Sequence, residues 1–176
     1  MFGLASGAVL AAVTAILLPL CMNGVIDFAF QEIVGYSAMV LSFLLVFFGV
    51  RSYRDGVAGG SITFGRAVGV GLLITLISCA VYVVSWEIVY YGFFPDFLDR
   101  YAAYQIERLR ADGASAAALA AKQAEMEYFA ELYANPLVNV AITFMEVFPV
   151  GLVVTLVSAG ILRRRTALPP ASAEPA

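Results

Sequence analysis

Histidine is absent from this 176-residue sequence, and charged residues make up only 13% of it. The missing histidine excludes a histidine-ligated zinc site, a serine–histidine dyad and a histidine proton relay. The formal net charge is -3 and there is no basic patch, so nucleic acid is not an expected partner. The two cysteines, Cys21 and Cys79, are expected at different depths, which disfavours a disulfide. We therefore expect a protein that is not an enzyme and holds no cofactor.

Apolar side chains, in contrast, are abundant: they make up 62% of the residues, and the mean hydropathy is +0.90. Average soluble proteins are roughly half apolar and a quarter charged. A soluble domain of this length could not bury so much apolar surface. The sequence therefore predicts an integral protein of the lipid bilayer.

Four apolar runs are long enough to cross a hydrocarbon core of about 30 Å as helices. They cover residues 2–22, 33–50, 64–94 and 137–162. Because the second run ends at Arg51, we interpret the segment after it, through Gly60, as a polar loop. We predict an all-α fold with a single four-span membrane domain over residues 1–165. A disordered tail rich in Pro and Ala is expected over residues 166–176.

The connection between the third and fourth runs, residues 96–134, has the pattern of a helical hairpin. Pro95 suits a first helical position, Gly113 interrupts the segment, and Ser115 can cap a second helix. Apolar residues recur at helical spacing on both arms, so each arm has a face to bury. Two interpretations stay open: these faces pack on each other or on the bilayer, or they dock another protein.

The distribution of arginine predicts the orientation in the membrane. Basic residues follow the second and fourth runs, whereas the first connection has none; the anchoring residues are Arg51, Arg54, Arg163, Arg164 and Arg165. Short loops that carry Lys and Arg stay in the cytoplasm. We therefore expect both termini in the cytoplasm and the hairpin outside.

Several short motifs follow one another along the chain. They are Arg51-Ser-Tyr-Arg-Asp55, Phe64 with Ala67, and residues 82–87, 94–97 and 146–151. Their order and spacing resemble a family of bacterial membrane proteins known as domain of unknown function 4199. The resemblance implies a four-span protein of the bacterial inner membrane and supplies no activity.

Small residues recur every fourth position in three of the predicted spans, among them Gly3, Gly7, Gly65, Gly69 and Gly151. Such stripes let helix backbones approach each other closely in lipid. We interpret them as packing within one four-helix bundle. Formation of a homo-oligomer through the stripe of the first span is the alternative.

Three glutamates from three spans are predicted to share one depth. Counted from the cytoplasmic arginines, Glu32, Glu87 and Glu146 lie roughly 28, 31 and 26 Å along their helices. No basic residue of the spans lies at that level. If the carboxylates converge, their repulsion favours a bound proton or a metal or other cation of unknown identity. If they do not, each is hydrated separately.

Pro149 interrupts the helical hydrogen bonding of the fourth span beside one of these glutamates. It frees the carbonyl of Met145, which predicts a kink and an exposed acceptor next to Glu146. This arrangement can help form a ligand site, or it can be a bend that only shapes packing.

Together these features favour a small non-enzymatic binding, assembly or accessory protein of the bacterial cytoplasmic membrane. The alternative is a cation- or proton-coupled carrier that uses Glu32, Glu87 and Glu146. A carrier would be expected to act as an oligomer, because four helices leave little room for a pathway.

Overall fold

The computed structural model describes residues 1–163, and all regular secondary structure in that part of the chain is helical. Four helices are long and apolar enough to cross a membrane, as predicted: α1 (Phe2–Met22), α2 (Phe28–Gly56), α3 (Phe64–Phe93) and α6 (Pro136–Leu162). Two shorter helices, α4 (Phe97–Ala111) and α5 (Ala116–Tyr133), join α3 to α6. Arg164, Arg165 and the predicted tail lie outside the described residues.

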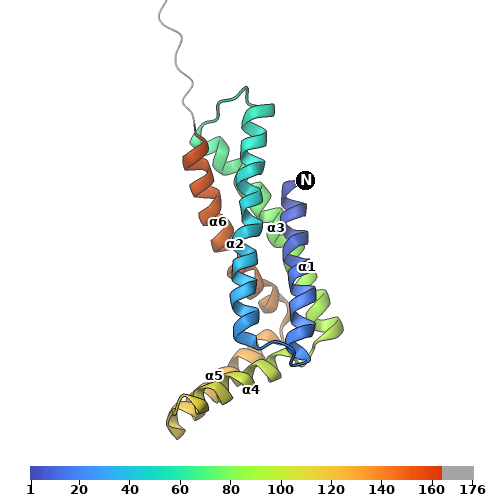
Figure 1. Ribbon diagram of the computed structural model, residues 1–176, viewed down its shortest axis with the longest axis vertical. Coiled ribbons are helices and arrows are strands. Elements are labelled where there is room, and N and C mark those ends of the chain that lie inside the picture. Colours follow the sequence, from blue (N-terminus) through green and yellow to red (C-terminus); the bar gives the residue numbers. More distant parts are fainter. Residues whose placement is uncertain (164–176) are drawn as a thin grey trace, which may run out of the picture.

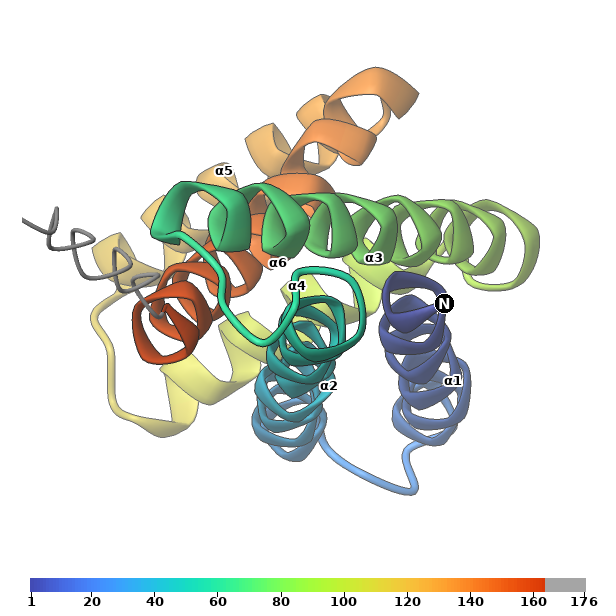
Figure 2. The ribbon, with the colours of Figure 1, turned by 90° about the horizontal axis from the view of Figure 1, so that it is seen from above.

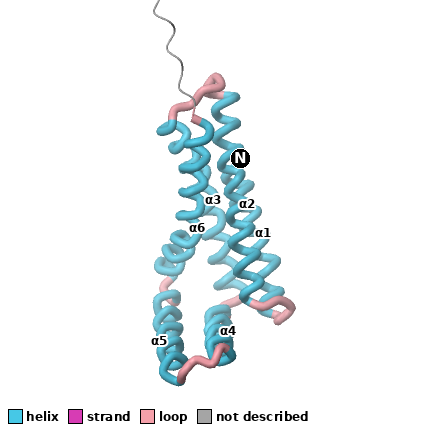
Figure 3. The backbone as a smooth tube through the Cα atoms, turned by 60° about the vertical axis from the view of Figure 1, so that its left-hand side comes forward, coloured by secondary structure: helices cyan, strands magenta, loops and turns pink. Residues whose placement is uncertain are grey.

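The long helices form one bundle with the hairpin of α4 and α5 at one end. The N-terminus, the α2–α3 loop and the described end of α6 lie toward the other end (Figure 1). Viewed from that end, α3 lies across the bundle (Figure 2) and packs against α1, α2 and α6. Figure 3 shows α4 and α5 side by side beyond the spans. The hairpin therefore covers the bundle at the end opposite to the N-terminus.

Helix α2 is longer than the second apolar run, and the expectation of a loop starting at Arg51 is wrong. The helix begins after Asp27, whose carboxylate accepts a hydrogen bond of 2.6 Å from the backbone N–H of Phe30. At its other end, Arg51 and Asp55 form an i,i+4 ion pair with an N–O distance of 3.7 Å. Hydropathy marks where the apolar surface stops, but charged residues can continue a helix beyond it.

Close helix contacts form where glycine lets two backbones approach. A Cβ atom added to Gly7 would lie 2.6 Å from Val81 of α3, and one added to Gly151 would lie 2.5 Å from Thr75. Gly3 also faces α3. The structure does not place Gly65 and Gly69 at such contacts, because a Cβ at either position would meet nothing within 4 Å. These two glycines lie on a face of α3 that the bundle leaves uncovered.

Buried hydroxyl groups connect the same helices. Ser6 of α1 and Ser42 of α2 place their hydroxyl oxygens 2.9 Å apart, and Ser42 also donates to the carbonyl of Ser6 at 2.7 Å. Thr75 of α3 and Thr155 of α6 have hydroxyl oxygens 2.9 Å apart. Interhelical hydrogen bonds of this kind contribute about 0.6 kcal/mol each in lipid. They add to tight packing rather than replace it.

The hairpin is attached to the bundle by hydrogen bonds and by several aromatic contacts. Arg100 of α4 donates a hydrogen bond of 2.7 Å to the carbonyl of Met22, the last residue of α1. The ring of Phe28 lies 5.5 Å from that of Tyr101 and 5.1 Å from that of Tyr104. Helix α4 begins at Phe97 and not at Pro95, so the proline precedes the N-cap.

Candidate functional site

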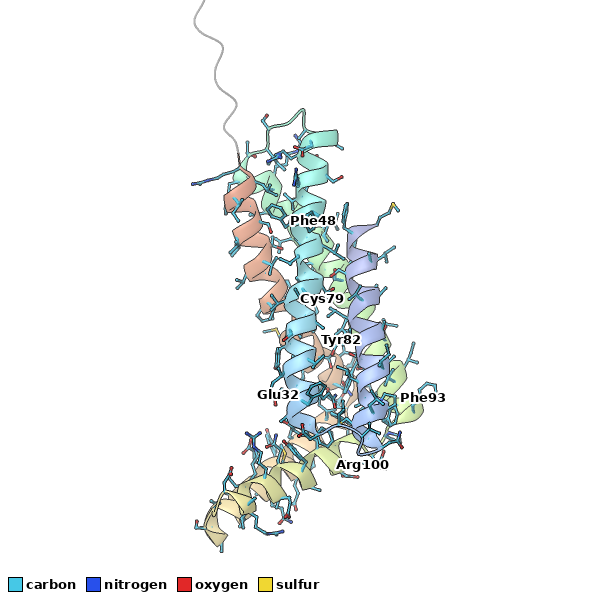
Figure 4. The ribbon with its side chains drawn as sticks, viewed as in Figure 1. Glu32, Phe48, Cys79, Tyr82, Phe93 and Arg100 are labelled. Carbon is cyan, nitrogen blue, oxygen red and sulfur yellow. The ribbon has the colours of Figure 1, made fainter. Side chains whose placement is uncertain are left out.

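A cavity of about 260 Å³ lies where the bundle meets the hairpin, and all six helices contribute to its walls. Most of the wall is apolar or aromatic; the aromatic members are Phe28, Tyr36, Tyr82, Trp86, Phe97, Tyr101, Phe129 and Tyr133. Glu32 and Tyr82 lie in the hairpin-side half of the bundle, whereas Cys79 lies farther from the hairpin (Figure 4). The cavity is therefore built from the spans and is closed from one side by the hairpin.

Two of the three predicted glutamates line this cavity together. Glu32 comes from the second turn of α2, and Glu146 comes from the middle of α6. Glu146 interacts electrostatically with Glu32 and with Tyr36. Glu32, Tyr36 and Glu146 are all exposed. The cavity therefore opens to its surroundings on the side formed by α2 and α6. The two carboxylates thus stand at the mouth of a largely apolar space.

Glu87 does not belong to this pair. It does not line the cavity, and it interacts instead with Tyr90 on its own helix. One of its carboxylate oxygens is buried without a hydrogen-bond partner. Within residues 1–163 no group of three acidic, cysteine or histidine side chains is arranged to hold a metal ion. Equal depth along the helices therefore did not bring the three glutamates together.

A buried polar network supports the wall next to the hairpin. Trp86 Nε1 donates a hydrogen bond of 3.2 Å to Oδ1 of Asn139, which also accepts one from the Thr143 hydroxyl at 3.2 Å. Because the Thr143 proton is engaged there, the Tyr133 hydroxyl must donate in its contact of 3.3 Å with Thr143. Burial raises the pKa of Tyr133 to about 12, so the phenol keeps this proton near neutral pH.

Aromatic contacts join the hairpin to the same wall. The ring of Phe97 of α4 meets Trp86 edge to face at 5.3 Å between centroids, and Tyr133 of α5 meets Tyr90 in the same way at 5.5 Å. Such pairs contribute about 0.5–1.5 kcal/mol beyond the area that they bury. Both arms of the hairpin are therefore held against α3, and they close the cavity at that end.

Pro149 lies inside α6, one turn beyond Glu146. Helix α6 changes direction between its first and second halves (Figure 2). The neighbouring Met145 is 61% exposed, so this residue lies on an outer face of the helix. The arginines Arg51, Arg54 and Arg163 lie at the helix ends far from the hairpin, as their positions in α2 and after α6 require.

Sequence reasoning missed two uncharged polar residues. Gln31 lines the cavity with a buried side-chain oxygen that has no hydrogen-bond partner, and Asn139 is fully buried in α6. A signal was present for Asn139, because an amide within an apolar span is costly unless it has a partner or a function. Gln31 precedes the second apolar run and gave no such signal. The aromatic lining had no distinctive signal, since aromatic residues are common near membrane interfaces.

The lining of the cavity is acidic and aromatic. It contains two carboxylates, one free amide oxygen and tyrosine hydroxyls, and no lysine or arginine of the described residues belongs to it. A cavity with negative charge at its mouth and aromatic walls favours positively charged ligands over negatively charged ones.

Comparison with known proteins identifies one family. A family model described as "Protein of unknown function (DUF4199)" matches residues 1–164. Neither the curated proteins nor the solved structures gave a match to the chain.

Proposed function

The chain belongs to the DUF4199 family of proteins of unknown function, and we propose that it is a non-enzymatic, ligand-binding accessory protein of the bacterial cytoplasmic membrane. Four long apolar helices support the membrane location. The observation that carries the proposal is the cavity at the junction of bundle and hairpin, because all six helices surround it. A hairpin that only covered the ends of the spans would not require carboxylates and a free amide oxygen beneath it.

In this proposal both termini face the cytoplasm and the hairpin lies outside. Arg51, Arg54 and Arg163 support this orientation, since they follow spans at the end opposite to the hairpin. The cavity then opens near the outer leaflet. A ligand would enter from that leaflet or from the space outside the membrane.

The lining supports binding rather than catalysis. A hydroxyl or thiol nucleophile needs an adjacent base within hydrogen-bond reach. Among the described serine, threonine and cysteine residues, Thr14 alone lines the cavity, and the sequence has no histidine to act as its base. The two carboxylates are therefore assigned to ligand recognition.

Any partner protein is proposed to dock on the hairpin. Tyr128 of α5 is 63% exposed and leaves an aromatic surface there. Gly3 and Gly7 are already in contact with α3 of the same chain, which argues against a homo-oligomer formed through their stripe.

Filling the cavity tests the proposed function. Gly35 lines the cavity, and a Cβ at this position would meet nothing within 4 Å, so Gly35→Leu should fill the space without disturbing the helix contacts. The matched control is Gly69→Leu, which adds the same side chain at an uncovered position of α3. Native mass spectrometry from lipid nanodiscs should detect a retained small molecule in the wild type and the control, but not in Gly35→Leu. Equal retention in all three proteins would contradict binding in the cavity.

A second candidate is a cation- or proton-coupled carrier. It is favoured by the position of Pro149 beside Glu146, because interrupted helices next to carboxylates form ion sites in transporters. Purified protein in liposomes should then conduct protons or sodium under an imposed gradient, and Glu146→Gln should abolish the flux. The carrier proposal fails if wild-type liposomes are no more permeable than empty ones.

A further inference from the structure

We infer that the cavity selects a primary ammonium compound with a compact apolar body. The inference rests on the proposed function, because it names the ligand class of the same cavity. Three properties of the lining lead to it: the sign of its charge, the type of its free hydrogen-bonding group and the nature of its walls.

Charge at the mouth of the cavity is negative and is not neutralised within it. Glu32 and Glu146 approach the space from α2 and α6, and no basic residue of the described chain lines it. At a site that is partly withdrawn from water, two nearby carboxylates favour a monovalent cation placed between them. An anionic ligand would be repelled by both.

The free polar group of the lining is an acceptor. The side-chain oxygen of Gln31 is buried and has no hydrogen-bond partner. Gln31 precedes Glu32 in α2, so the amide oxygen and the carboxylate belong to the same turn. A primary ammonium group has donors for both carboxylates and for this oxygen. A quaternary ammonium group has none, and it would leave the amide oxygen unpaired.

The walls require an apolar body and exclude a hydrated metal ion as the natural ligand. Trp86, Phe97 and Tyr101 present aromatic surface, and aromatic faces attract ammonium groups by about 0.5–2 kcal/mol. Calcium takes six to eight oxygen ligands, whereas this lining is mostly apolar and aromatic and offers two carboxylates, one free amide oxygen and a few hydroxyl groups. The volume of about 260 Å³ lies just below the roughly 300–1,000 Å³ of common ligand pockets, which limits the ligand to a compact group.

The single tryptophan of the chain gives a direct reporter, because Trp86 lines the cavity. The probe is 2-phenylethylammonium, and its neutral and anionic counterparts of similar shape are 2-phenylethanol and phenylacetate. Each is titrated into the protein in nanodiscs of phosphatidylglycerol while Trp86 emission is recorded. We expect a saturable change with 2-phenylethylammonium alone.

Substitutions then test the assignment of residues. Glu32→Gln and Glu146→Gln should each raise the apparent Kd by about tenfold, which corresponds to loss of one charge-assisted contact. Glu87→Gln is the matched control, since Glu87 does not line the cavity, and it should change the Kd by less than about twofold. Thermal unfolding of each variant shows that it is folded before titration.

The possible outcomes separate this inference from the proposed function. Equal binding of the three probes, or a Kd unaffected by both cavity substitutions, would overturn the ammonium assignment and leave binding in the cavity intact. If no probe changes Trp86 emission and Gly35→Leu retains the same molecules as the wild type, both proposals fail.

The ammonium group can belong to a lipid or to a dissolved amine, and a second lipid composition distinguishes these sources. Phosphatidylethanolamine carries a primary ammonium headgroup. If that headgroup is the ligand, including this lipid in the nanodiscs should compete with 2-phenylethylammonium and raise its apparent Kd. An unchanged Kd would assign the site to a soluble amine. Both results support the ammonium class.

Discussion

Trp86 and Asn139 are joined by a hydrogen bond of 3.2 Å from the indole nitrogen to the amide oxygen, and the Asn139 side chain is fully buried. This contact links α3 to α6 at the wall of the cavity. The Asn139 oxygen also accepts a hydrogen bond from Thr143, and Thr143 contacts Tyr133 of the hairpin. One amide therefore supports the spans and the element that covers them.

Substitution of Asn139 by leucine should disturb both stability and tryptophan emission. The change keeps the branching at Cγ but leaves the Trp86 N–H and the Thr143 hydroxyl without their acceptor, at a cost of about 1–3 kcal/mol. We expect a lower unfolding temperature and a blue-shifted Trp86 emission. Val140→Leu, at a 37% exposed position on the same helix, is the control and should change neither. An unaltered emission spectrum in Asn139→Leu would show that the hydrogen bond does not form in the membrane.

The number of spans could be predicted from the sequence, but which glutamates line the cavity could not. Apolar length determines which segments can cross a bilayer, and four such helices are present. Distance along a helix, however, gives depth and not direction around the axis, which turns by about 100° per residue. Glu32 and Glu146 face one cavity, whereas Glu87 faces elsewhere. Only the packing of α3 against its neighbours determines that direction.

Direction around the helix axis also determines which glycines of the stripes meet another helix. Gly7 and Gly69 occupy equivalent positions in four-residue repeats, yet only Gly7 meets another helix. We expect Gly7→Leu to destabilise the bundle by about 1–3 kcal/mol, because the added side chain would overlap α3. Gly69→Leu should change the unfolding temperature little. Thermal unfolding in detergent measures both, and equal losses would indicate that Gly69 packs against a second copy of the protein.

Arg100 should control how firmly the hairpin is held. Its guanidinium donates to the carbonyl of Met22 at 2.7 Å and pairs with Asp96, while Arg110 is paired only with Glu107 of its own helix. Arg100→Ala is therefore expected to speed amide hydrogen exchange in α4, and Arg110→Ala should not. Exchange mass spectrometry of the purified protein tests this contrast. If α4 exchanges within seconds in the wild type, the hairpin is ordered only by a partner.

Repulsion between Glu32 and Glu146 should appear as coupling between two neutralising substitutions. Both carboxylates line the cavity without a basic partner in its lining, and each interacts with the other. Glu32→Gln or Glu146→Gln alone should relieve the repulsion and raise the unfolding temperature in amine-free detergent. The double variant should gain little more, because either substitution already removes the interaction.

We expect a coupling free energy of about 0.5–1 kcal/mol, since solvent screens carboxylates at the open mouth of the cavity. Pairing Glu87→Gln with Glu146→Gln is the control cycle, and its effects should add because Glu87 lies outside the cavity. Additive effects in the Glu32–Glu146 cycle would mean that the two carboxylates are hydrated independently. The cavity would then lack the concentrated negative charge on which recognition of an ammonium group depends.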